Sequence, residues 1–286
     1  MSTVEESGNG SGSRSRGGGG GGTAGRPGPP AYVPPHGLLR GRTAVVTAAA
    51  GAGIGGATAR RFLEEGARIT IGDAHARRLK ETEQALAAEF GADRVTSLPC
   101  DVTDEEQVRA LFAHAERAHG GLDIVVNNAG LGGTAALVDM TDEQWSRVLD
   151  VTLNGTFRCT RAALRSFRAA GRGGVVVNNA SVIGWRAQTG QAHYAAAKAG
   201  VMALTRCAAL EAAEFGVRVN AVAPSLAMHP HLAKVTSQDL LDELTSREAF
   251  GRYAEPWEIA NVIVFLAGDY SSYMTGETVS VSSQRA

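Results

Sequence analysis

Short apolar runs alternate with longer amphipathic stretches from Gly41 to the end of the chain. The pattern predicts strands at residues 43–47, 68–72, 94–100, 123–127, 174–180, 217–222 and 277–282. The first six runs are apolar on both faces, as strands buried between two layers of helices are. The stretches between the runs predict helices near residues 55–65, 77–90, 104–119, 142–170, 192–214 and 256–267.

This regular alternation of strand and helix indicates an α/β protein. Consecutive parallel strands joined by a helix favour right-handed crossovers. We therefore expect one domain with a doubly wound, seven-stranded parallel sheet and helices on both faces. Ligands of such sheets bind beyond the carboxyl ends of the strands, where the strand order reverses.

The starts of three helices carry local sequence signals. Thr103 with Glu106, and Thr141 with Gln144, have the spacing of capping boxes. Pro256 suits the first turn of the last long helix, where an amide hydrogen has no partner within the helix. We expect helices to begin at these positions.

The first 36 residues differ in composition from the rest of the chain. They are rich in Gly, Ser and Pro and contain almost no apolar residues to bury. We expect residues 1–36 to be a disordered tail and residues 37–286 to form the folded domain. The tail lacks the apolar core of a secretory signal, so it is either a flexible tether or a dispensable start.

Charge and cysteine content exclude several classes of function. The formal net charge is -1, which gives no electrostatic reason to expect binding to nucleic acid or to an anionic membrane. No apolar stretch approaches the ~20 residues that cross a bilayer. Cys100, Cys159 and Cys207 are odd in number, widely spaced and without metal-ligand spacing. We expect reduced core thiols, no metal site and a cytoplasmic protein.

Candidate chemistry lies between Ser181 and Lys198. Tyr194 and Lys198 are four residues apart, so they share one face of a helix. A phenol titrates near pH ~10 in water, and a nearby cation moves its pKa toward the working range of an enzyme. Ser181 ends an apolar strand, where a hydroxyl can hold a substrate oxygen against the phenol. The structural alternative is an alanine-rich helix with a buried tyrosine and a solvated lysine.

A glycine-rich segment, TAAAGAGIGGATARRF, follows the first strand at residues 47–62. Its glycines allow a tight turn and a close approach of the backbone to a pyrophosphate, and the next helix points its first amides at that anion. Asp73 ends the second strand, where a carboxylate accepts both adenosine ribose hydroxyls and repels a 2′-phosphate. This favours NAD over NADP, although Arg77 and Arg78 keep NADP open. The alternative for Asp73 is a simple turn residue.

Small and polar residues end two further strands. Asp101 follows the third strand and is placed to reach the adenine edge. Asn127, Asn128, Ala129 and Gly130 end the fourth strand, where small residues let the backbone pass beside a cofactor and asparagines tie neighbouring strands together. Both assignments have a purely structural alternative.

Taken together, these residues resemble the short-chain dehydrogenase/reductase family. The resemblance extends from about Leu38 to the C-terminus and rests on six features. They are TAAAGAGIG, NNAG (127–130), Ser181, YAAAK (194–198), NAVAP (220–224) and GRYAEPWEIA (251–260). It implies a single Rossmann domain, a nicotinamide cofactor, and hydride transfer between a secondary alcohol and a ketone.

The resemblance also implies roles for individual residues. Tyr194 is the proton donor or acceptor, Lys198 tunes the phenol and binds the nicotinamide ribose, and Ser181 holds the substrate oxygen. Thr152 replaces the family's usual helix asparagine and is expected to hold a water. The implied cofactor-binding residues are Thr47, Ala49, Gly51, Gly53, Ile54, Gly55, Asp73, Asp101, Val102, Asn128, Ala129, Gly130, Tyr194, Lys198 and Pro224.

The sequence departs from the family at several positions. Ala48 replaces the first glycine of the nucleotide loop, which also has one extra residue. Pro224 is followed by serine instead of glycine, and His229 stands where a threonine is usual. The path of the pyrophosphate and the contacts of the carboxamide are therefore expected to differ in detail.

Within the family, the chain resembles a group of actinobacterial enzymes of steroid C/D-ring breakdown, which act on hydroxy-methylhexahydroindanone propionate-CoA. The shared runs are TAAAG-x-GIG, NNAS-x-x-GWRAQ, HYAAAKAGVMALTR and AEPWE. This resemblance implies a ring hydroxyl of a bicyclic acid, or of its CoA thioester, as substrate. Residues 225–250, which include His231 and Lys234, correspond to the segment that covers the substrate. Arg186 either meets a carboxylate or phosphate of the substrate or is a plain surface arginine.

Two other functions stay open at this point. One is a 3-oxoacyl-thioester reductase, and the other is a non-catalytic, dinucleotide-sensing protein with the same fold. The segments 142–170 and 192–214 offer small residues for packing against copies of the chain, so we expect a homo-oligomer, either dimer or tetramer.

Overall fold

The computed structural model of the 286-residue chain describes residues 28–228 and 238–283. Its centre is one parallel sheet with the strand order β3-β2-β1-β4-β5-β6-β7. Every neighbouring pair of strands is parallel, which confirms the predicted α/β class and the doubly wound sheet. The strands are β1 Thr43–Thr47, β2 Arg68–Asp73, β3 Val95–Pro99, β4 Ile124–Asn127, β5 Gly174–Asn179, β6 Val217–Pro224 and β7 Thr278–Val281.

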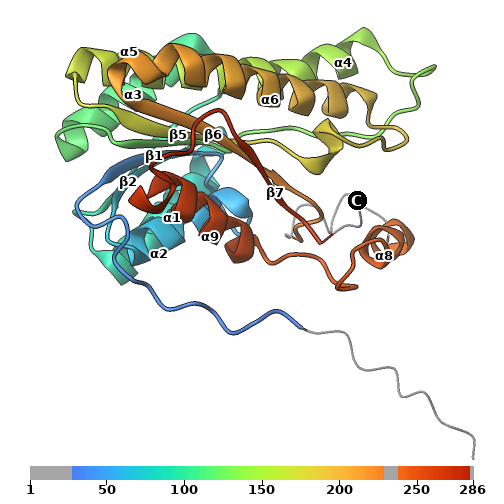
Figure 1. The fold of residues 1–286 in the computed structure, drawn as a ribbon, viewed down its shortest axis with the longest axis horizontal. Coiled ribbons are helices and arrows are strands. Elements are labelled where there is room, and N and C mark those ends of the chain that lie inside the picture. Colours follow the sequence, from blue (N-terminus) through green and yellow to red (C-terminus); the bar gives the residue numbers. More distant parts are fainter. Residues whose placement is uncertain (1–27, 229–237, 284–286) are drawn as a thin grey trace, which may run out of the picture.

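Helices cover both faces of this sheet (Figure 1). Helices α1, α2 and α9 lie on one face, and α3, α5 and α6 lie on the other, with α4 at the end of that layer. The helices are α1 Ile54–Glu64, α2 Ala76–Phe90, α3 Glu105–His119, α4 Asp142–Leu149, α5 Gly155–Ala170, α6 Ala192–Ala212, α8 Gln238–Ser246 and α9 Pro256–Ala267.

The two faces of the sheet build two separate hydrophobic cores. Val46 of β1 packs into the core under α1 and α9, whereas its neighbour Val45 packs into the core under α3 and α5. Successive side chains of a strand point to opposite faces, so an apolar run fills both cores at once. This is why the strands are apolar at consecutive positions rather than at alternate ones.

The predicted helix 142–170 is interrupted. Asp150–Asn154 forms one turn of π-helix between α4 and α5, so a single continuous helix is wrong here. A π-turn inserts an extra residue and changes which face the following residues present. Thr152, in the middle of this turn, is fully buried, whereas Asn154 is exposed and donates to Asp150.

The ends of the helices confirm two of the three predicted signals. Thr141 and Gln144 form the capping box that begins α4, and Pro256 lies in the first turn of α9. The box at Thr103 is wrong, because Asp104 is the N-cap of α3 and accepts from the amides of residues 106 and 107. The Thr103 hydroxyl instead donates to Asp101, so it is not available to the helix.

The predicted N-terminal tail has two parts. Residues 1–27 lie outside the described residues, whereas residues 28–36 form neither helix nor strand but contact α1 and α9. The Tyr32 hydroxyl donates to Glu64 at 2.6 Å, and the Tyr32 ring meets Trp257 edge-on at 5.2 Å. The predicted boundary at residue 37 stays a prediction, but contacts with the folded domain begin before it.

Cysteine burial differs from the prediction at one position. Cys100 and Cys159 are buried core thiols, whereas Cys207 on α6 is exposed, so the prediction of a core thiol is wrong there. Burial raises the pKa of the Cys100 thiol to about 12 and raises that of Cys159 as well, which keeps both thiols protonated. In the part of the chain that the structure describes, no helix has the length and apolar character needed to span a bilayer.

Candidate active site

The candidate site lies at the carboxyl ends of β1, β4 and β5. β1 pairs with β2 on one side and with β4 on the other, so the strand order reverses between β1 and β4. Parallel strands bring their carboxyl ends to one edge of the sheet, and the reversal opens a crevice there. The sequence places its polar residues at this edge: Thr47, Asn127, Asn128, Asn178, Asn179 and Ser181.

A ladder of asparagines holds these strand ends together. Asn127 donates to the side chain of Asn178 at 2.8 Å, and Asn179 donates to that of Asn128, also at 2.8 Å. Asn128 in turn donates to the carbonyl of Ala48, which links β4 to the turn after β1. This confirms that the asparagines of β4 tie neighbouring strands. Their partners on β5 were not identified from the sequence, although the repeated Asn-Asn pair is a signal that could have found them.

Three side chains meet at the end of β5. Ser181 is the residue before a short 3-10 turn, and its side chain lies near enough to the phenol of Tyr194, on the first turn of α6, to act on the pKa of that phenol. Lys198 lies one turn further along α6, with its Nζ 5.5 Å from the centroid of the Tyr194 ring. The Lys198 ammonium donates to the Asn179 carbonyl at 2.5 Å. The structure therefore brings Ser181, Tyr194 and Lys198 together, as expected from their spacing.

Burial dominates the electrostatics of this cluster. It raises the pKa of Tyr194 to about 12, and the hydrogen bond from Ser181 opposes the rise. It also lowers the pKa of Lys198 to about 8, because a buried ammonium loses its hydration. The expected downward shift of the phenol by the lysine is therefore wrong for the protein alone.

Thr152 positions the loop that follows β4. Its hydroxyl accepts from the amide of Leu131 at 3.0 Å and donates to the carbonyl of the same residue at 3.1 Å. One side chain therefore saturates both backbone groups of Leu131. Because Thr152 donates its hydroxyl proton to the Leu131 carbonyl, it has no proton left for the water that we expected it to hold. Such a water would have to donate to the remaining lone pair of the Thr152 oxygen.

Gly130 lies where this loop passes Lys198. A Cβ on Gly130 would stand 3.3 Å from the Lys198 Nζ and 3.8 Å from the Thr152 hydroxyl. The absence of a side chain lets the loop pack against the lysine without displacing it. This placement agrees with the prediction that small residues line the end of β4.

The glycine-rich turn after β1 has two kinds of glycine. A Cβ on Gly55 would lie 2.3 Å from the Ala48 carbonyl oxygen, and one on Gly56 would lie 1.8 Å from that of Gly51, so these two glycines are needed for packing. Nothing lies within 4 Å of a Cβ on Gly51 or Gly53. The open side of the turn has room for a ligand, and the closed side holds α1 against the sheet.

The start of α1 can hold an anion. Gly53 is the N-cap, and the helix has neither a side-chain cap nor an acidic residue in its first turn. Backbone amides and the helix dipole therefore face the open side of the turn without an internal acceptor. Together with the free space at Gly51 and Gly53, this arrangement fits the pyrophosphate of a dinucleotide.

Ala48 carries the strain of this turn. Its φ of 51° lies in the left-handed region, which glycine adopts far more easily than alanine. The family's glycine was expected at this position from the sequence, and the structure shows why it is usual there. In this chain alanine adopts the left-handed conformation at that position.

Asp73 is held at the edge of the turn. Its carboxylate accepts from the amide of Ala50 at 3.1 Å and from that of His75 at 2.9 Å. Burial raises the pKa of Asp73, while the Ala50 hydrogen bond and the charge of Arg78 oppose the rise. The side chain of Arg77 is exposed and lies 3.6 Å from Glu81. The carboxylate is therefore fixed in orientation beside the predicted ribose position.

The remaining predicted cofactor residues are mostly internal. Thr47 is buried, and its hydroxyl accepts from the amides of Asn128 and Ala129 at 3.0 and 3.2 Å, so it ties β1 to the end of β4. Ala49, Val102 and Pro224 are buried at the ends of their strands or just after them, and Ile54 begins α1. These residues shape the crevice, and their contacts with a cofactor stay predictions.

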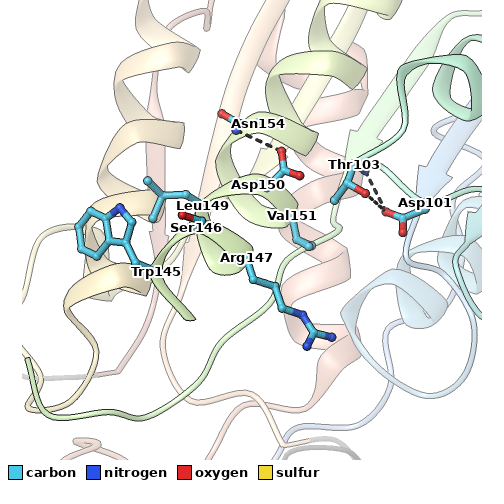
Figure 2. Close-up of a pocket in the computed structure, with 9 residues that line it drawn as sticks. All are labelled: Asp101, Thr103, Trp145, Ser146, Arg147, Leu149, Asp150, Val151 and Asn154. Atoms are coloured by element: carbon cyan, nitrogen blue, oxygen red, sulfur yellow. Dashed lines mark hydrogen bonds between the residues drawn. The ribbon is translucent and has the colours of Figure 1, made fainter. Parts of the chain in front are cut away.

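Asp101 lies on a separate hollow of about 690 Å³ (Figure 2). Its carboxylate accepts from the amide and the hydroxyl of Thr103 at 2.9 and 2.8 Å. The hollow is lined by Asp101, Thr103, Trp145, Ser146, Arg147, Leu149, Asp150, Val151 and Asn154. Ser181, Tyr194 and Lys198 are not among these residues, so the hollow is distinct from the cluster. His229, His231 and Lys234 of the predicted substrate-covering segment lie outside the described residues.

Comparisons with known proteins agree with this architecture. A family model described as "Enoyl-(Acyl carrier protein) reductase" matches residues 48–283. A Mycobacterium tuberculosis protein is 62% identical over 255 residues, which are 89% of this chain and 97% of that protein. It is named (5R,7aS)-5-hydroxy-7a-methyl-1-oxo-2,3,5,6,7,7a-hexahydro-1H-indene-carboxyl-CoA reductase.

Two further proteins extend the comparison. The cis-4-hydroxycyclohexanecarboxylate dehydrogenase of Sinomonas cyclohexanicum is 42% identical over 84% of this chain and 94% of its own length. The crystal structure of a short chain dehydrogenase from Mycobacterium smegmatis superposes with a TM-score of 0.80 at 59% identity. It covers 90% of this chain and 98% of the solved one.

Proposed function

The chain belongs to the short-chain dehydrogenase/reductase family of oxidoreductases, and on that premise we propose that it interconverts a ring ketone and a secondary alcohol on a bicyclic indane-type acid, carried as its CoA thioester. The observation that carries the reaction class is the contact of Ser181 with Tyr194, with Lys198 one turn behind. The choice of substrate is supported by the Mycobacterium tuberculosis reductase and by the cyclohexane-ring dehydrogenase.

The site residues divide the proton chemistry between them. When bound, a nicotinamide cofactor supplies or accepts the hydride at the substrate carbon. Ser181 holds the substrate oxygen by a hydrogen bond, and Tyr194 gives its phenol proton to that oxygen as it gains charge. A pKa of about 12 keeps the phenol protonated near neutral pH, so that Tyr194 has a proton to give. Tyr194 then recovers a proton from solvent.

We further propose NAD as the preferred cofactor. The support is Asp73, whose carboxylate is oriented by two backbone amides and lies beside the nucleotide turn. A carboxylate there accepts ribose hydroxyls and repels the 2′-phosphate of NADP. The charge of Arg78 lowers the pKa of Asp73, and Arg77 lies 3.6 Å from Glu81. Each arginine thus interacts with a carboxylate of the protein, which is not the arrangement expected of a site built for the 2′-phosphate of NADP.

We also infer a homo-oligomer, dimer or tetramer, in the cytoplasm. Support for assembly comes from exposed apolar side chains on the helices above the sheet, among them Trp145, Phe157 and Leu210. Support for a reducing compartment comes from the three cysteines, all of which are free. Light scattering measures the assembly, and a monomeric mass would contradict the inference.

A spectrophotometric assay tests the proposed reaction. The purified protein is given the indane-dione carboxyl-CoA thioester or acetoacetyl-CoA, each with NADH or NADPH, and absorbance is followed at 340 nm. We expect the bicyclic thioester with NADH to give the highest kcat/KM. A preference for acetoacetyl-CoA would identify a 3-oxoacyl-thioester reductase instead. No turnover of either substrate with either cofactor would support a dinucleotide-sensing protein.

A further inference from the structure

We propose that His193 is a positioning residue for Tyr194, an inference that rests on the proposed function. Helix α6 begins at Ala192, and its N-cap residue Gln191 provides no side-chain cap. The amide of Tyr194 belongs to the first turn, where amides have no partner within the helix. His193 supplies the acceptor, because its Nδ1 takes the hydrogen bond from the Tyr194 amide at 2.9 Å.

This hydrogen bond fixes the state of the imidazole. A ring nitrogen that accepts a hydrogen bond carries no proton, so a neutral His193 holds its hydrogen on Nε2. The ring is buried, at 2% exposure. The side chain therefore caps the Tyr194 amide from inside the protein.

The other edge of the ring meets the loop that follows β4. A Cβ on Gly133 would lie 3.3 Å from His193 Nε2, which is closer than ordinary packing allows. The loop is also bonded to the residues before the histidine. Gln191 donates to the Gly133 carbonyl at 2.7 Å and to the Thr134 hydroxyl at 3.1 Å, and the Ala135 amide donates to the Gly190 carbonyl at 3.1 Å.

The loop is thus held at both ends. Thr152 saturates Leu131 at its start, and residues 190–193 hold residues 133–135. His193 lies between this fixed loop and the main chain of Tyr194. We infer that the imidazole transmits the position of the loop to the first turn of α6 and so keeps the Tyr194 phenol on the Ser181 hydroxyl.

Two substitutions of His193 separate this role from simple packing. His193→Asn keeps an acceptor oxygen close to the place of Nδ1, whereas His193→Leu keeps volume and removes the acceptor. With the ketone that the wild type reduces, we expect His193→Leu to lower kcat by about tenfold or more, since small misplacements of reacting groups cost that much. We expect His193→Asn to recover most of kcat and both variants to keep the NADH dissociation constant.

A matched control and a second probe complete the test. His114→Leu removes a histidine on α3 that bonds Thr96, away from the cluster, and we expect it to leave kcat unchanged. Gly133→Ala pushes on the imidazole from the loop side, and we expect it to lower kcat in the same way as His193→Leu. Should His193→Leu fail to fold, Gly133→Ala and His193→Asn still give the answer.

Crystal structures of the variants give a readout that does not need turnover. We expect the contact between Ser181 and Tyr194 to be lost in His193→Leu and kept in His193→Asn. Equal kcat in the wild type and His193→Leu, or an intact contact in the His193→Leu crystal, would overturn the positioning role. A wild type that reduces no ketone would overturn the proposed function instead, and the crystal structures would still decide the role of His193.

Discussion

The nucleotide turn and the Tyr194 cluster lie at the same edge of the sheet but are held in different ways. In the turn, backbone packs directly on backbone, so that a Cβ on Gly55 or Gly56 would overlap a carbonyl oxygen. In the cluster, side chains hold backbone: Lys198 binds the Asn179 carbonyl, and Thr152 binds Leu131. We therefore expect the turn to be disrupted by substitutions that add atoms. We expect the geometry of the cluster to be disrupted by substitutions that remove polar groups.

The cluster is most sensitive at its reacting group. Tyr194→Phe removes the only proton that the ring can give, and we expect kcat to fall by about a hundredfold to ten-thousandfold. Thr152→Asn keeps a donor and an acceptor beside Leu131 and should retain activity. Turnover numbers with NADH measure both variants. A more active Tyr194→Phe than Thr152→Asn would end the assignment of Tyr194.

The turn is most sensitive on its closed side. Gly56→Ala places a Cβ 1.8 Å from the Gly51 carbonyl oxygen, and we expect a loss of about 1–3 kcal/mol in the free energy of unfolding. Gly53→Ala meets no atom within 4 Å and should leave stability unchanged while weakening NADH binding. Urea unfolding and NADH fluorescence titration separate the two effects. Equal destabilisation by both substitutions would contradict the division into packing and binding glycines.

Substitution of Lys198 measures what the buried ammonium of the cluster costs in the free energy of unfolding. Burial lowers its pKa from 10.5 to about 8. Below pH 8 the side chain is charged in both the folded and the unfolded chain, so the whole cost of burying the ammonium is present there. The cost shrinks as pH rises from about 8 toward 10.5, where the unfolded chain also loses the proton. We expect Lys198→Met to be more stable than the wild type by about 1–3 kcal/mol at pH 7 and to lose that advantage near pH 10.

Unfolding by urea at several pH values measures this difference. The comparison is made between the variant and the wild type at each pH, so that other titrating groups cancel. A difference that stays constant from pH 7 to pH 10 would show that Lys198 is not held with a lowered pKa. Activity should be lost in Lys198→Met at every pH.

The smallest expected effect is a change of cofactor preference on substitution of Asp73 beside the turn. Asp73→Ser removes the charge while keeping a short polar side chain, and we expect the preference for NADH over NADPH to fall by about tenfold or more. Asp269→Ser is the matched control, because Asp269 is an exposed carboxylate that pairs with Arg42 and has no place in the proposed cofactor site. An unchanged preference in Asp73→Ser would show that Asp73 only accepts hydrogen bonds within the turn and does not select the cofactor.

Much of the architecture follows from local sequence patterns. The apolar runs at 43–47 and 68–72 are strands, and their consecutive apolar residues correctly indicate a sheet covered on both faces. The spacing of Tyr194 and Lys198 places them one turn apart, as any helix would. The capping box at Thr141 is read within four residues. Each of these features depends on neighbours in the chain, so the sequence contains what is needed to predict it.

Other features depend on contacts between distant residues. The π-turn at Asp150–Asn154 accompanies the pairing of Thr152 with Leu131, which is 21 residues away. The pKa of Tyr194 is raised because the fold removes water from the phenol. The local sequence does not reveal how far that side chain is shielded from solvent. The proposed role of His193 likewise depends on a loop that returns to it from β4.

The amino-acid pattern therefore dictates which elements form and which chemical groups stand at their ends, because periodicity and spacing are properties of neighbouring residues. Only the folded chain decides how those groups are charged, which of them touch, and which glycines face open space. Burial and long-range hydrogen bonds set these properties, and both come into being when separate segments pack together.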